Sequence, residues 1–311
     1  FKQEHLNHTG SHKITNSLFQ ILLAKRMGKS HLICESGAGQ HYSATAAVAA
    51  KFNMPLVGVM GDIDVSRVNQ NIIKAKHYGA KLKTVPGTLK EAITDAIKTW
   101  TTNPEYAYIC GSVVSSSPFP KIVAFAQSII GREIREQSMS QEGKIPDMIC
   151  GCVGGGSNFA GAIYEFLDEP SVTKIGVEAH ETAALTNGTP GIMQGMKTYM
   201  LQTDDGAKSL GGMSLGAGIT YFSVGPLHSY LKDQGAVKYS SATDKEMLEA
   251  YKIIAQTEGI CSALEPMAAA AEIIFRQAKD KPKDYIICLS LCGRGEKDLD
   301  TIQEHIGKDF E

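Results

Sequence analysis

A lysine near the start of the chain stands where a polar loop meets a helix. The loop reads Asn-His-Thr-Gly-Ser-His before Lys13, and apolar residues follow at helical spacing. The positive end of a helix dipole disfavours the ammonium form of a lysine, which favours a nucleophilic amine. Such an amine can form a Schiff base with an aldehyde. Taken alone, such a segment more often contains a solvent-exposed lysine at the start of a helix than a reactive one.

A glycine cluster follows an apolar strand-like run in the middle of the chain. Residues 153–158 read Val-Gly-Gly-Gly-Ser-Asn and precede a helical pattern. Glycines let backbone amides approach an anion closely, and Ser157 and Asn158 can donate hydrogen bonds. The cluster predicts a phosphate site, with a structural tight turn as the alternative. It does not match the dinucleotide-binding fingerprint, and it lacks the lysine of a P-loop.

Two further segments at strand ends carry groups able to do chemistry. Residues 35–41 read Glu-Ser-Gly-Ala-Gly-Gln-His, which suits a carboxylate-binding loop with Glu35 as an acid or base. The thiol of Cys292 can donate a weak hydrogen bond to a ring nitrogen. Glu265 begins an alanine-rich helix and can contact a cofactor. The alternatives are a helix cap, a buried cysteine and a favourable helix-dipole charge, respectively.

Helix-like and strand-like segments alternate through most of the 311 residues. The pattern predicts strands at 31–34, 55–60, 81–85, 106–110, 147–153, 174–178 and 285–291. It predicts helices at 13–27, 40–52, 66–77, 89–100, 121–137, 158–167, 244–257 and 267–278. Residues 186–218 show weak periodicity. Repeated βα units predict mostly parallel sheets covered by helices, in two three-layer α/β domains. Ligands then bind at the carboxyl ends of strands, in a cleft between the domains.

Composition excludes several classes of protein. Charged residues make up 21% and the formal net charge is −2, without a basic block, which argues against a nucleic-acid partner. No stretch is long and apolar enough to predict a membrane helix. The seven irregularly spaced cysteines predict reduced thiols in a cytoplasmic protein, and Cys150 and Cys152 lack partners at metal-ligand spacing. The abrupt start leads us to expect preceding residues, so a lost targeting segment stays open.

Six motifs together resemble the tryptophan synthase beta subunit family. NHTGSHK, LLAKRMGK, ESGAGQH, GCVGGGSN, TEGICSALE and CGRGEKD occur in that family's order, and the likeness extends from Glu4 to Ile306. The resemblance implies a fold type II enzyme that depends on pyridoxal 5'-phosphate (PLP). It implies an N-terminal α/β domain at 12–125, with a mobile lid at about 28–111, and a C-terminal α/β domain at 126–311 that includes residues 1–11.

The resemblance also implies roles for individual residues. Lys13 would hold the cofactor and shuttle the α-proton of serine, and Glu35 would help the β-hydroxyl to leave. Cys292 would face the pyridine nitrogen, and Glu265 would lie near the ring. The phosphate would be bound by His12, Gly154, Gly155, Gly156, Ser157 and Asn158. The substrate would be bound by Ser36, Gly37, Ala38, Gly39, Gln40, His41 and Thr220.

The implied activity is that of a carbon–oxygen lyase of the tryptophan synthase type. L-Serine and indole would condense to L-tryptophan in a cytoplasmic homodimer, with an alpha subunit as a further partner and a monovalent cation as a second cofactor. No metal ligand set, nucleic-acid site or membrane segment is implied.

The chain departs from the family at several positions. Thr220 stands where the family usually has the aspartate that contacts the serine hydroxyl and a lid arginine, for which Arg67 is the match. Cys292 replaces serine, Glu296 replaces aspartate, and Tyr42 replaces glycine. Tyr42 would reshape the pocket. These changes favour a second hypothesis, a serine β-eliminase, deaminase or β-replacement enzyme with another nucleophile. A non-catalytic subunit and a nicotinamide-dependent oxidoreductase are weaker alternatives.

Overall fold

A computed structural model gives the fold and describes residues 1–66, 70–206 and 208–310. The chain divides into two compact units. The small unit is Asn7–Gly111, and the large unit combines Phe1–Leu6 with Ser112–Glu311. The domain limits expected from the sequence, 12–125 and 126–311, stay a prediction. Arg67, the expected partner in the lid, lies outside the described residues.

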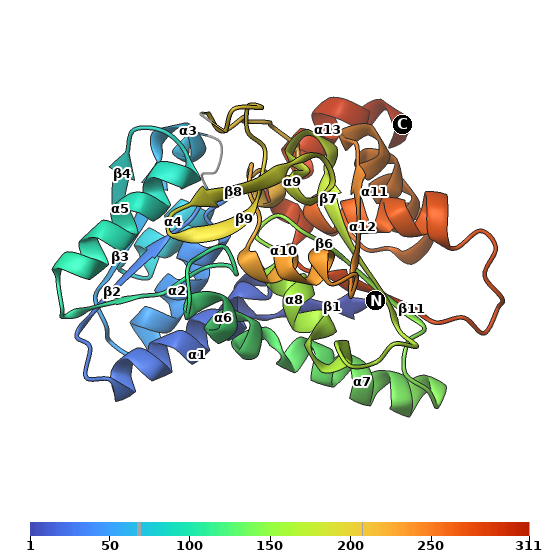
Figure 1. Cartoon of the computed structure of the whole chain (residues 1–311), viewed down its shortest axis with the longest axis horizontal. Helices are drawn as coiled ribbons and strands as arrows, with labels where there is room; N and C mark the ends of the chain where they lie inside the picture. Colours follow the sequence, from blue (N-terminus) through green and yellow to red (C-terminus); the bar gives the residue numbers. More distant parts are fainter. Residues whose placement is uncertain (67–69, 207, 311) are drawn as a thin grey trace. The chain divides into compact units, whose positions relative to one another are not determined.

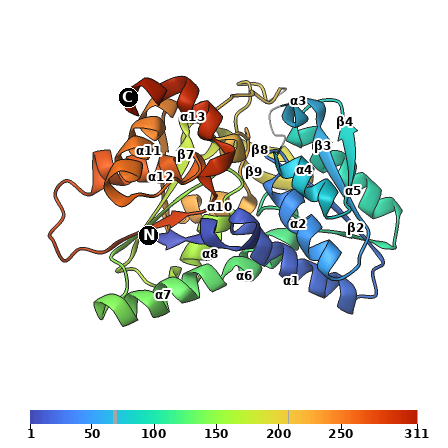
Figure 2. The ribbon, with the colours of Figure 1, turned by 180° about the vertical axis from the view of Figure 1, so that it is seen from behind.

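The small unit is a parallel sheet with helices on both faces. Its described elements are α1 (Lys13–Arg26), β2 (His31–Glu35), α2 (Gln40–Lys51), β3 (Leu56–Gly61), α3 (Asp62–Val65), α4 (Gln70–His77), β4 (Lys81–Val85), α5 (Leu89–Thr102) and β5 (Tyr106–Tyr108). The strand order is β4-β3-β2-β5, and every neighbouring pair is parallel. α5 covers one face of the sheet, and α1, α2 and α4 lie on the other (Figure 1, Figure 2).

The core of the small unit packs helices α1 and α2 against strands β2 and β3. Leu32 and Cys34 of β2 are fully buried together with Ile21 of α1. Tyr42 is fully buried as well, and its ring lies against Gly58 of β3, where a Cβ would stand 2.2 Å from the ring. Tyr42 is therefore a core residue that fills the space between α2 and β3.

The large unit contains a second parallel sheet and one antiparallel hairpin. Its described elements are β1 (Lys2–Gln3), α6 (Phe119–Gln127), α7 (Ile129–Glu142), β6 (Met148–Cys152), α8 (Ser157–Ile163), β7 (Thr173–Ala179), α9 (Ala184–Asn187), β8 (Thr189–Met193), β9 (Met196–Met200), α10 (Pro226–Asp233), β10 (Lys238–Ala242), α11 (Asp244–Glu258), α12 (Glu265–Glu272), β11 (Ile287–Leu291) and α13 (Leu299–Ile306). The sheet order is β1-β11-β6-β7-β10, all parallel, and β8 pairs antiparallel with β9.

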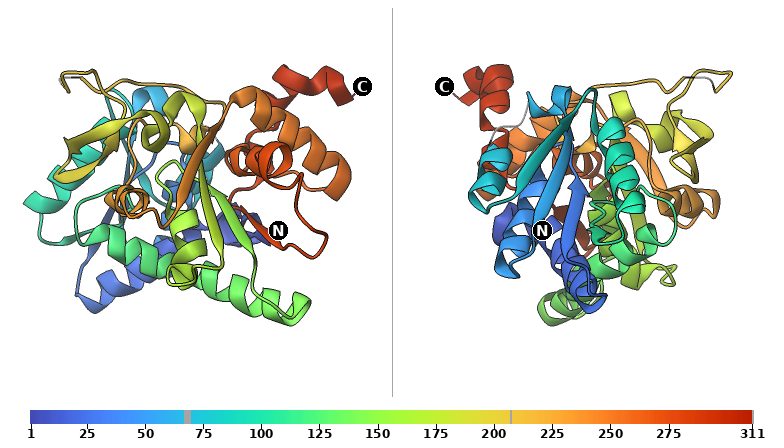
Figure 3. Two further views of the ribbon diagram at one scale, coloured as in Figure 1. Left: turned by 45° about the vertical axis from the view of Figure 1, so that its right-hand side comes forward. Right: turned by 90° about the vertical axis from the view of Figure 1, so that its left-hand side faces the viewer.

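Strand β6 is central in this sheet and is buried on both faces. Cys150 and Cys152 belong to the core formed with α11 and α12. Ile149 and Val153 belong to the core formed with α7, α8 and α10. This alternation is the two-residue period of a strand between two helical layers. The left view of Figure 3 shows this sheet turned by 45°, with helices on either side.

The predicted fold class, α/β with mostly parallel sheets, is confirmed. Several element predictions were wrong in detail. The helix expected at 121–137 is two helices, α6 and α7, which meet at Ser128. The weakly periodic segment 186–218 contains the β8–β9 hairpin, and α10, β10 and α13 were not predicted. Within the described residues, no helix is long and apolar enough to cross a membrane.

Candidate active site

Lys13 is the first residue of α1, and its amine is held by a backbone carbonyl. Nζ donates to the carbonyl oxygen of Gly111 at 2.5 Å. One and two turns further along α1, the side-chain amides of Asn16 and Gln20 both donate to the Cys110 carbonyl at 2.8 Å. These bonds fix the segment that carries Gly111 to α1, so the lysine amine has a defined position within the small unit.

Glu35, the last residue of β2, meets the same glycine. Its Oε1 accepts a hydrogen bond from the Gly111 N–H at 3.0 Å, and the side chain is buried. Burial raises the pKa of the Glu35 carboxyl, while hydrogen bonds from Gly111 and Tyr108 and the charge of Lys13 act in the opposite direction. One glycine thus joins the two residues expected to be catalytic, through its carbonyl and its N–H. Sequence reasoning placed residue 111 only at the end of the expected lid and gave it no role in the site.

The loop that follows β2 is fixed by a glycine in the left-handed conformation. Gly39 has φ of 73°, and a Cβ there would lie 2.8 Å from the Cβ of Asn71. The Asn71 side-chain amide donates to the Ala38 carbonyl at 2.9 Å. The loop expected to bind a carboxylate, residues 36–41, is therefore tied to α4 and keeps its shape within the small unit.

His41, at the end of this loop, is a neutral imidazole. Its Nε2 lies 2.7 Å from the Ile109 carbonyl oxygen, so this nitrogen carries the proton. Burial, followed by the charge of Lys13, lowers the pKa of His41 to about 3. A Cβ on Gly111 would lie 2.5 Å from the imidazole, so His41 packs directly on the glycine that binds Lys13 and Glu35.

In the large unit, residues 154–158 form the glycine loop, which comprises the turn after β6 and the first two residues of α8. Gly156 has φ of 79°, and a Cβ there would stand 2.2 Å from Nε2 of His228. A Cβ on Gly154 would stand 2.6 Å from the Cα of Ile219. Any side chain at Gly154 or Gly156 would clash with these neighbours. With glycine there, the backbone amides of the loop are open to close approach by an anion.

The end of this loop is positioned by Asn158. Its side-chain Nδ2 donates to the Cys152 carbonyl at 3.2 Å, while Oδ1 is buried without a hydrogen-bond partner among the described residues. The backbone N–H of Asn158 lies in the first turn of α8 and has no acceptor within the helix. Ser157, the first residue of α8, is buried, and a Cβ on Gly155 would meet Ser112.

His228 supports the glycine loop and was missed by sequence reasoning. Its Nε2 donates to the Gly156 carbonyl at 2.9 Å, and its Nδ1 accepts from the Tyr239 hydroxyl at 2.9 Å. Burial lowers the pKa of His228 to about 4, so the ring is neutral and can make both bonds. His228 belongs to α10 and Tyr239 to β10. Because neither segment carries a recognisable sequence motif, only the folded structure reveals their contact with the glycine loop.

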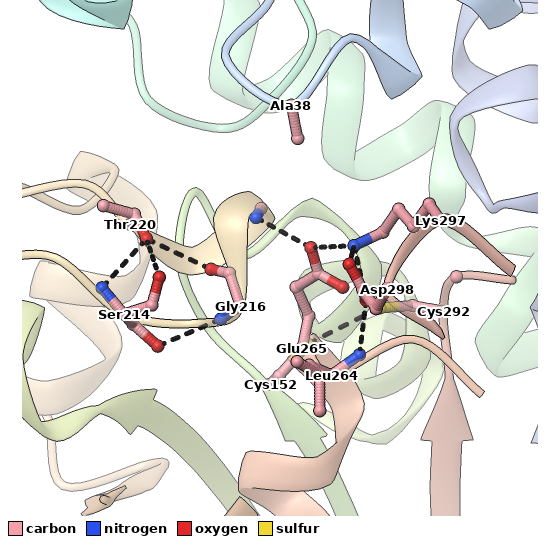
Figure 4. Close-up of polar contacts among 12 residues, drawn as sticks. Ala38, Cys152, Ser214, Gly216, Thr220, Leu264, Glu265, Cys292, Lys297 and Asp298 are labelled. Atoms are coloured by element: carbon pink, nitrogen blue, oxygen red, sulfur yellow. Dashed lines mark hydrogen bonds and ion pairs between the residues drawn. The ribbon is translucent and has the colours of Figure 1, made fainter. Parts of the chain in front are cut away.

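Glu265, at the start of α12, lies in a buried ion network (Figure 4). Its Oε1 accepts from the Gly218 N–H at 2.7 Å and from Lys297 Nζ at 2.8 Å. Lys297 also donates to Asp298 at 2.7 Å, and Asp298 accepts from the Leu264 N–H at 2.8 Å. The charge of Lys297 lowers the pKa of Glu265 against the opposing effect of burial, so this carboxylate is ionised.

Comparisons with known proteins decide the family. A family model described as "Pyridoxal-phosphate dependent enzyme" matches residues 1–293. The tryptophan synthase beta chain of Dinoroseobacter shibae is 46% identical over 99% of this chain and 78% of its own length. That of Allorhizobium ampelinum is 48% identical over the same shares. This chain belongs to the tryptophan synthase beta chain family of pyridoxal-phosphate-dependent enzymes.

Solved structures similar to this member of the tryptophan synthase beta chain family show the fold. A mutant O-ureido-L-serine synthase with O-ureido-L-serine bound has a TM-score of 0.73 at 19% identity, covering 97% of this chain and 85% of its own. A threonine deaminase from T.th. has a TM-score of 0.73 at 20% identity, covering 95% and 86%. Both likenesses support the predicted fold class.

Thr220, which the sequence resemblance sets apart from the usual pattern of the tryptophan synthase beta chain family, makes hydrogen bonds within its own loop. Its Oγ1 donates to the carbonyls of Ser214 and Gly216, at 3.3 and 3.2 Å (Figure 4). The loop is in turn anchored by Asp244, which accepts from the Ser214 hydroxyl at 2.6 Å. Thr220 thus stabilises the residue 214–220 loop with a neutral hydroxyl, at the position where the resemblance implies that the family usually has an aspartate.

Cys292, the residue expected to face the cofactor's ring nitrogen, lies next to another thiol. Its Sγ is 3.5 Å from Sγ of Cys152, and both side chains are buried. Cys152 ends β6 and Cys292 follows β11, which are neighbouring parallel strands. In the described part of the chain, no group of three or more histidine, cysteine or acidic side chains could hold a metal ion.

The structure gathers the predicted site residues into two sets, one in each unit. Lys13, Glu35 and His41 converge on Gly111 in the small unit, where His12 and the residue 36–41 loop also lie. In the large unit, the 3₁₀ turn Ala217–Ile219 links the glycine loop to Glu265 and is followed by Thr220. The second set includes Lys297 and Asp298, which sequence reasoning left without a role.

Proposed function

We propose that this enzyme carries out PLP-dependent β-replacement on L-serine and condenses it with indole to give L-tryptophan. The observation that carries the proposal is the convergence of Lys13 and Glu35 on Gly111, which places an amine and a buried carboxyl on one residue. Relatives that are 46% and 48% identical over 99% of the chain and named tryptophan synthase beta chain support it.

The residues present fit the cofactor. Lys13 offers an amine at a fixed position, and residues 154–158 form a loop whose glycines leave no room for side chains. We assign the phosphate to this loop and to His12, and the ring nitrogen to the Cys292 thiol, with Glu265 near the ring. A thiol does not keep a ring nitrogen protonated as a carboxylate would, which favours elimination over transamination. When bound, PLP supplies the electron sink that makes the α-proton of serine acidic.

The chain's own groups would then move two protons. The Lys13 amine would take the proton from the α-carbon of serine and return it to that carbon once the bond to indole has formed. Glu35, whose pKa is raised by burial, would deliver a proton to the serine hydroxyl as the C–O bond breaks. The resulting carboxylate accepts the proton that indole loses when its carbon bonds to the β-carbon. The residue 36–41 loop, which ends at the neutral His41, would hold the substrate carboxylate with its backbone amides.

A product assay tests the proposal. The protein is loaded with PLP, mixed with L-serine and indole, and the products are identified by mass spectrometry. We expect tryptophan, and we expect borohydride reduction to attach the cofactor to Lys13. Lys13→Ala should remove both signals, whereas Lys51→Ala, at an exposed lysine ending α2, should keep them. Bound PLP without tryptophan formation contradicts the proposal.

A second candidate function is favoured by Thr220. Because its hydroxyl is used inside the residue 214–220 loop, it offers the serine hydroxyl no carboxylate. A serine β-eliminase or deaminase, or an enzyme using another nucleophile, would need none of the indole-specific steps. Pyruvate as the main product with serine and indole would select this candidate, and Thr220→Asp should then raise the ratio of tryptophan to pyruvate.

The assembly and location expected from the family are part of the same proposal. We assign the enzyme to the cytoplasm as a homodimer that binds an alpha subunit, with a monovalent cation as an additional cofactor. Light scattering of the PLP-loaded protein tests the dimer. Titration with a tryptophan synthase alpha chain tests the partner, and activity in potassium against tetramethylammonium salts tests the cation.

A further inference from the structure

We propose that Lys297 is a positioning residue, which holds the Glu265 carboxylate against Gly218 and thereby fixes the turn that supports the phosphate loop and Thr220. The inference rests on the proposed role of residues 154–158 in binding PLP. It goes beyond that role, because neither Lys297 nor the turn Ala217–Ile219 takes part in the proposed chemistry.

The ammonium of Lys297 uses its donors entirely within the ion network. Nζ donates to Glu265 Oε1 at 2.8 Å and to both carboxylate oxygens of Asp298, at 2.8 and 2.7 Å. The Lys297 side chain is 12% exposed, and those of Glu265 and Asp298 are 7% and 8% exposed. Within this network, two buried carboxylates share one buried cation, so the cation decides whether both can stay ionised.

The carboxylate held by Lys297 also binds the backbone of the turn. Glu265 Oε1 accepts from the Gly218 N–H at 2.7 Å, and a Cβ on Gly218 would lie 2.6 Å from the same oxygen. Asp298 binds the Leu264 N–H, directly before Glu265, and so holds the start of α12. Figure 4 shows the chain of contacts from Lys297 through Glu265 to the turn.

The turn lies directly against the glycine loop. A Cβ on Gly154 would stand 2.6 Å from the Cα of Ile219 and 2.8 Å from the Gly218 carbonyl oxygen, so the two backbones are in close contact. The Thr182 hydroxyl donates to the Ile219 carbonyl at 2.9 Å on the way to Thr220. A shift of the turn Ala217–Ile219 would therefore displace both Gly154 of the phosphate loop and Thr220, which directly follows the turn.

Removing the ammonium releases this arrangement. Glu265 and Asp298 would then be two unneutralised carboxylates in a buried site, and each would have to take up a proton or move toward water. In either case Oε1 of Glu265 ceases to be a fixed, charged acceptor for the Gly218 N–H. The phosphate loop keeps its sequence but loses the support beneath Gly154.

The test compares four variants of the full chain. Lys297→Met removes the charge, and Lys297→Arg keeps it. Gly218→Ala disturbs the same contact from the other side. Lys174→Met is the matched control, because Lys174 is a buried lysine of the same unit that donates to the Phe166 and Glu169 carbonyls, away from the network. The readouts are the dissociation constant of PLP from visible absorbance, the absorption maximum of bound PLP, KM and kcat for serine, and thermal stability.

We expect Lys297→Met and Gly218→Ala to weaken PLP binding by about tenfold or more, as for the loss of one charge-assisted hydrogen bond. They should also raise the KM for serine more than they lower kcat. Lys297→Arg should recover most of the PLP affinity, and Lys174→Met should lower thermal stability alone.

A purely structural role predicts a different pattern, which would overturn the inference. Lys297→Met would then lose thermal stability like Lys174→Met but keep the PLP dissociation constant and the absorption maximum of the wild type. Folded Lys297→Arg protein with no better PLP affinity than Lys297→Met would overturn it as well. Because PLP binding is measured without turnover, a wild type that binds PLP but makes no tryptophan contradicts only the proposed function.

Discussion

At the scale of single residues, Gly111 is the feature that organises the small-unit half of the proposed site. It binds the Lys13 amine through its carbonyl and the Glu35 carboxyl through its N–H, and it leaves just enough room for His41. Burial raises the pKa of the Glu35 carboxyl, which is the direction that a group acting as a proton donor requires.

Glu35→Gln should separate binding from chemistry. The amide keeps the size of the side chain and can still accept from the Gly111 N–H, but it cannot give up a proton. We expect tryptophan formation to fall by about 10²–10⁴-fold, the usual contribution of a general acid or base. PLP affinity, measured by absorbance titration, should change little. Glu105→Gln, at an exposed carboxylate, serves as the control, and equal losses in both variants would argue against the assigned role.

The thiols of Cys152 and Cys292 are close enough to be joined by oxidation. Their sulfur atoms are 3.5 Å apart in neighbouring segments, so modest side-chain rotation brings them to bonding distance. We expect diamide to form the disulfide in PLP-free protein, with the loss of two hydrogen atoms seen by mass spectrometry of the linked peptides. Cys292→Ser should prevent this and keep activity. Linkage to Cys261, the exposed cysteine, would show that the pair is held apart.

At the scale of elements, the glycine loop depends on a close approach between β6, α8 and α10. Gly156 combines a left-handed backbone with contact to His228, whose neutral ring is itself fixed by Tyr239. The loop is therefore held by packing from outside its own sequence, which has a direct consequence for substitution.

Gly156→Ala should be far more damaging than a substitution at another left-handed glycine. Its Cβ would meet His228 Nε2 at 2.2 Å, whereas Gly143, with φ of 72°, has open space around it. Both alanines carry a left-handed strain of about 1–2 kcal/mol, so Gly143→Ala measures the strain alone. We expect only Gly156→Ala to lose PLP binding. Equal effects of the two variants on urea unfolding and PLP affinity would contradict the packing argument.

Elements with strong periodicity could be predicted from the sequence. The strand at 81–85 has the predicted bounds, because alternating residues end at a glycine turn. The single helix expected at 121–137 failed because the apolar spacing continues across Ser128, where the chain turns without a glycine. The β8–β9 hairpin was missed because the methionines and glycines of residues 186–218 give little alternation.

The predicted site fared in a similar way. Residues that belong to glycine motifs, such as 36–41 and 154–158, could be located because the motif itself implies a loop between a strand and a helix. The groups that hold those loops come from distant positions: His228 is 72 residues from Gly156, and Lys297 is 32 from Glu265. No local pattern marks such partners, since only the folded chain brings them together.

At the scale of the whole molecule, the family and the dependence on PLP predicted from the sequence are confirmed. The stability of the fold should depend on pH through a buried carboxyl. Glu178 of β7 accepts hydrogen bonds from Leu185 and Thr186 at the start of α9. Burial nevertheless raises its pKa to about 7 from a reference of 4.5. Between pH 4.5 and 7, Glu178 is therefore mostly protonated in the folded chain and mostly ionised in the unfolded chain.

This difference sets the sign of a pH effect on stability. Because the folded state holds more protons between pH 4.5 and 7, the free energy of unfolding should fall as pH rises through this window, by up to about 1.4 kcal/mol per unit of pKa difference. Urea unfolding at a series of pH values measures the slope. Glu178→Gln should flatten it, and Glu181→Gln, at a neighbouring exposed carboxylate, should leave it unchanged. An unaltered slope in Glu178→Gln would place the effect elsewhere.

Strand β6 has a consequence for how this family member can change over time. The register of its hydrogen bonds with β7 and β11 determines which of the two cores each side chain of β6 enters. It also determines where residues 154–158 lie along the edge of the sheet. Deleting one residue within β6 would turn the residues beyond the deletion, including Cys152, toward the opposite core. It would also shift the glycine loop along the sheet by the length of one residue. We therefore expect length variation among relatives to fall outside β6, while side chains within it exchange for others of similar volume.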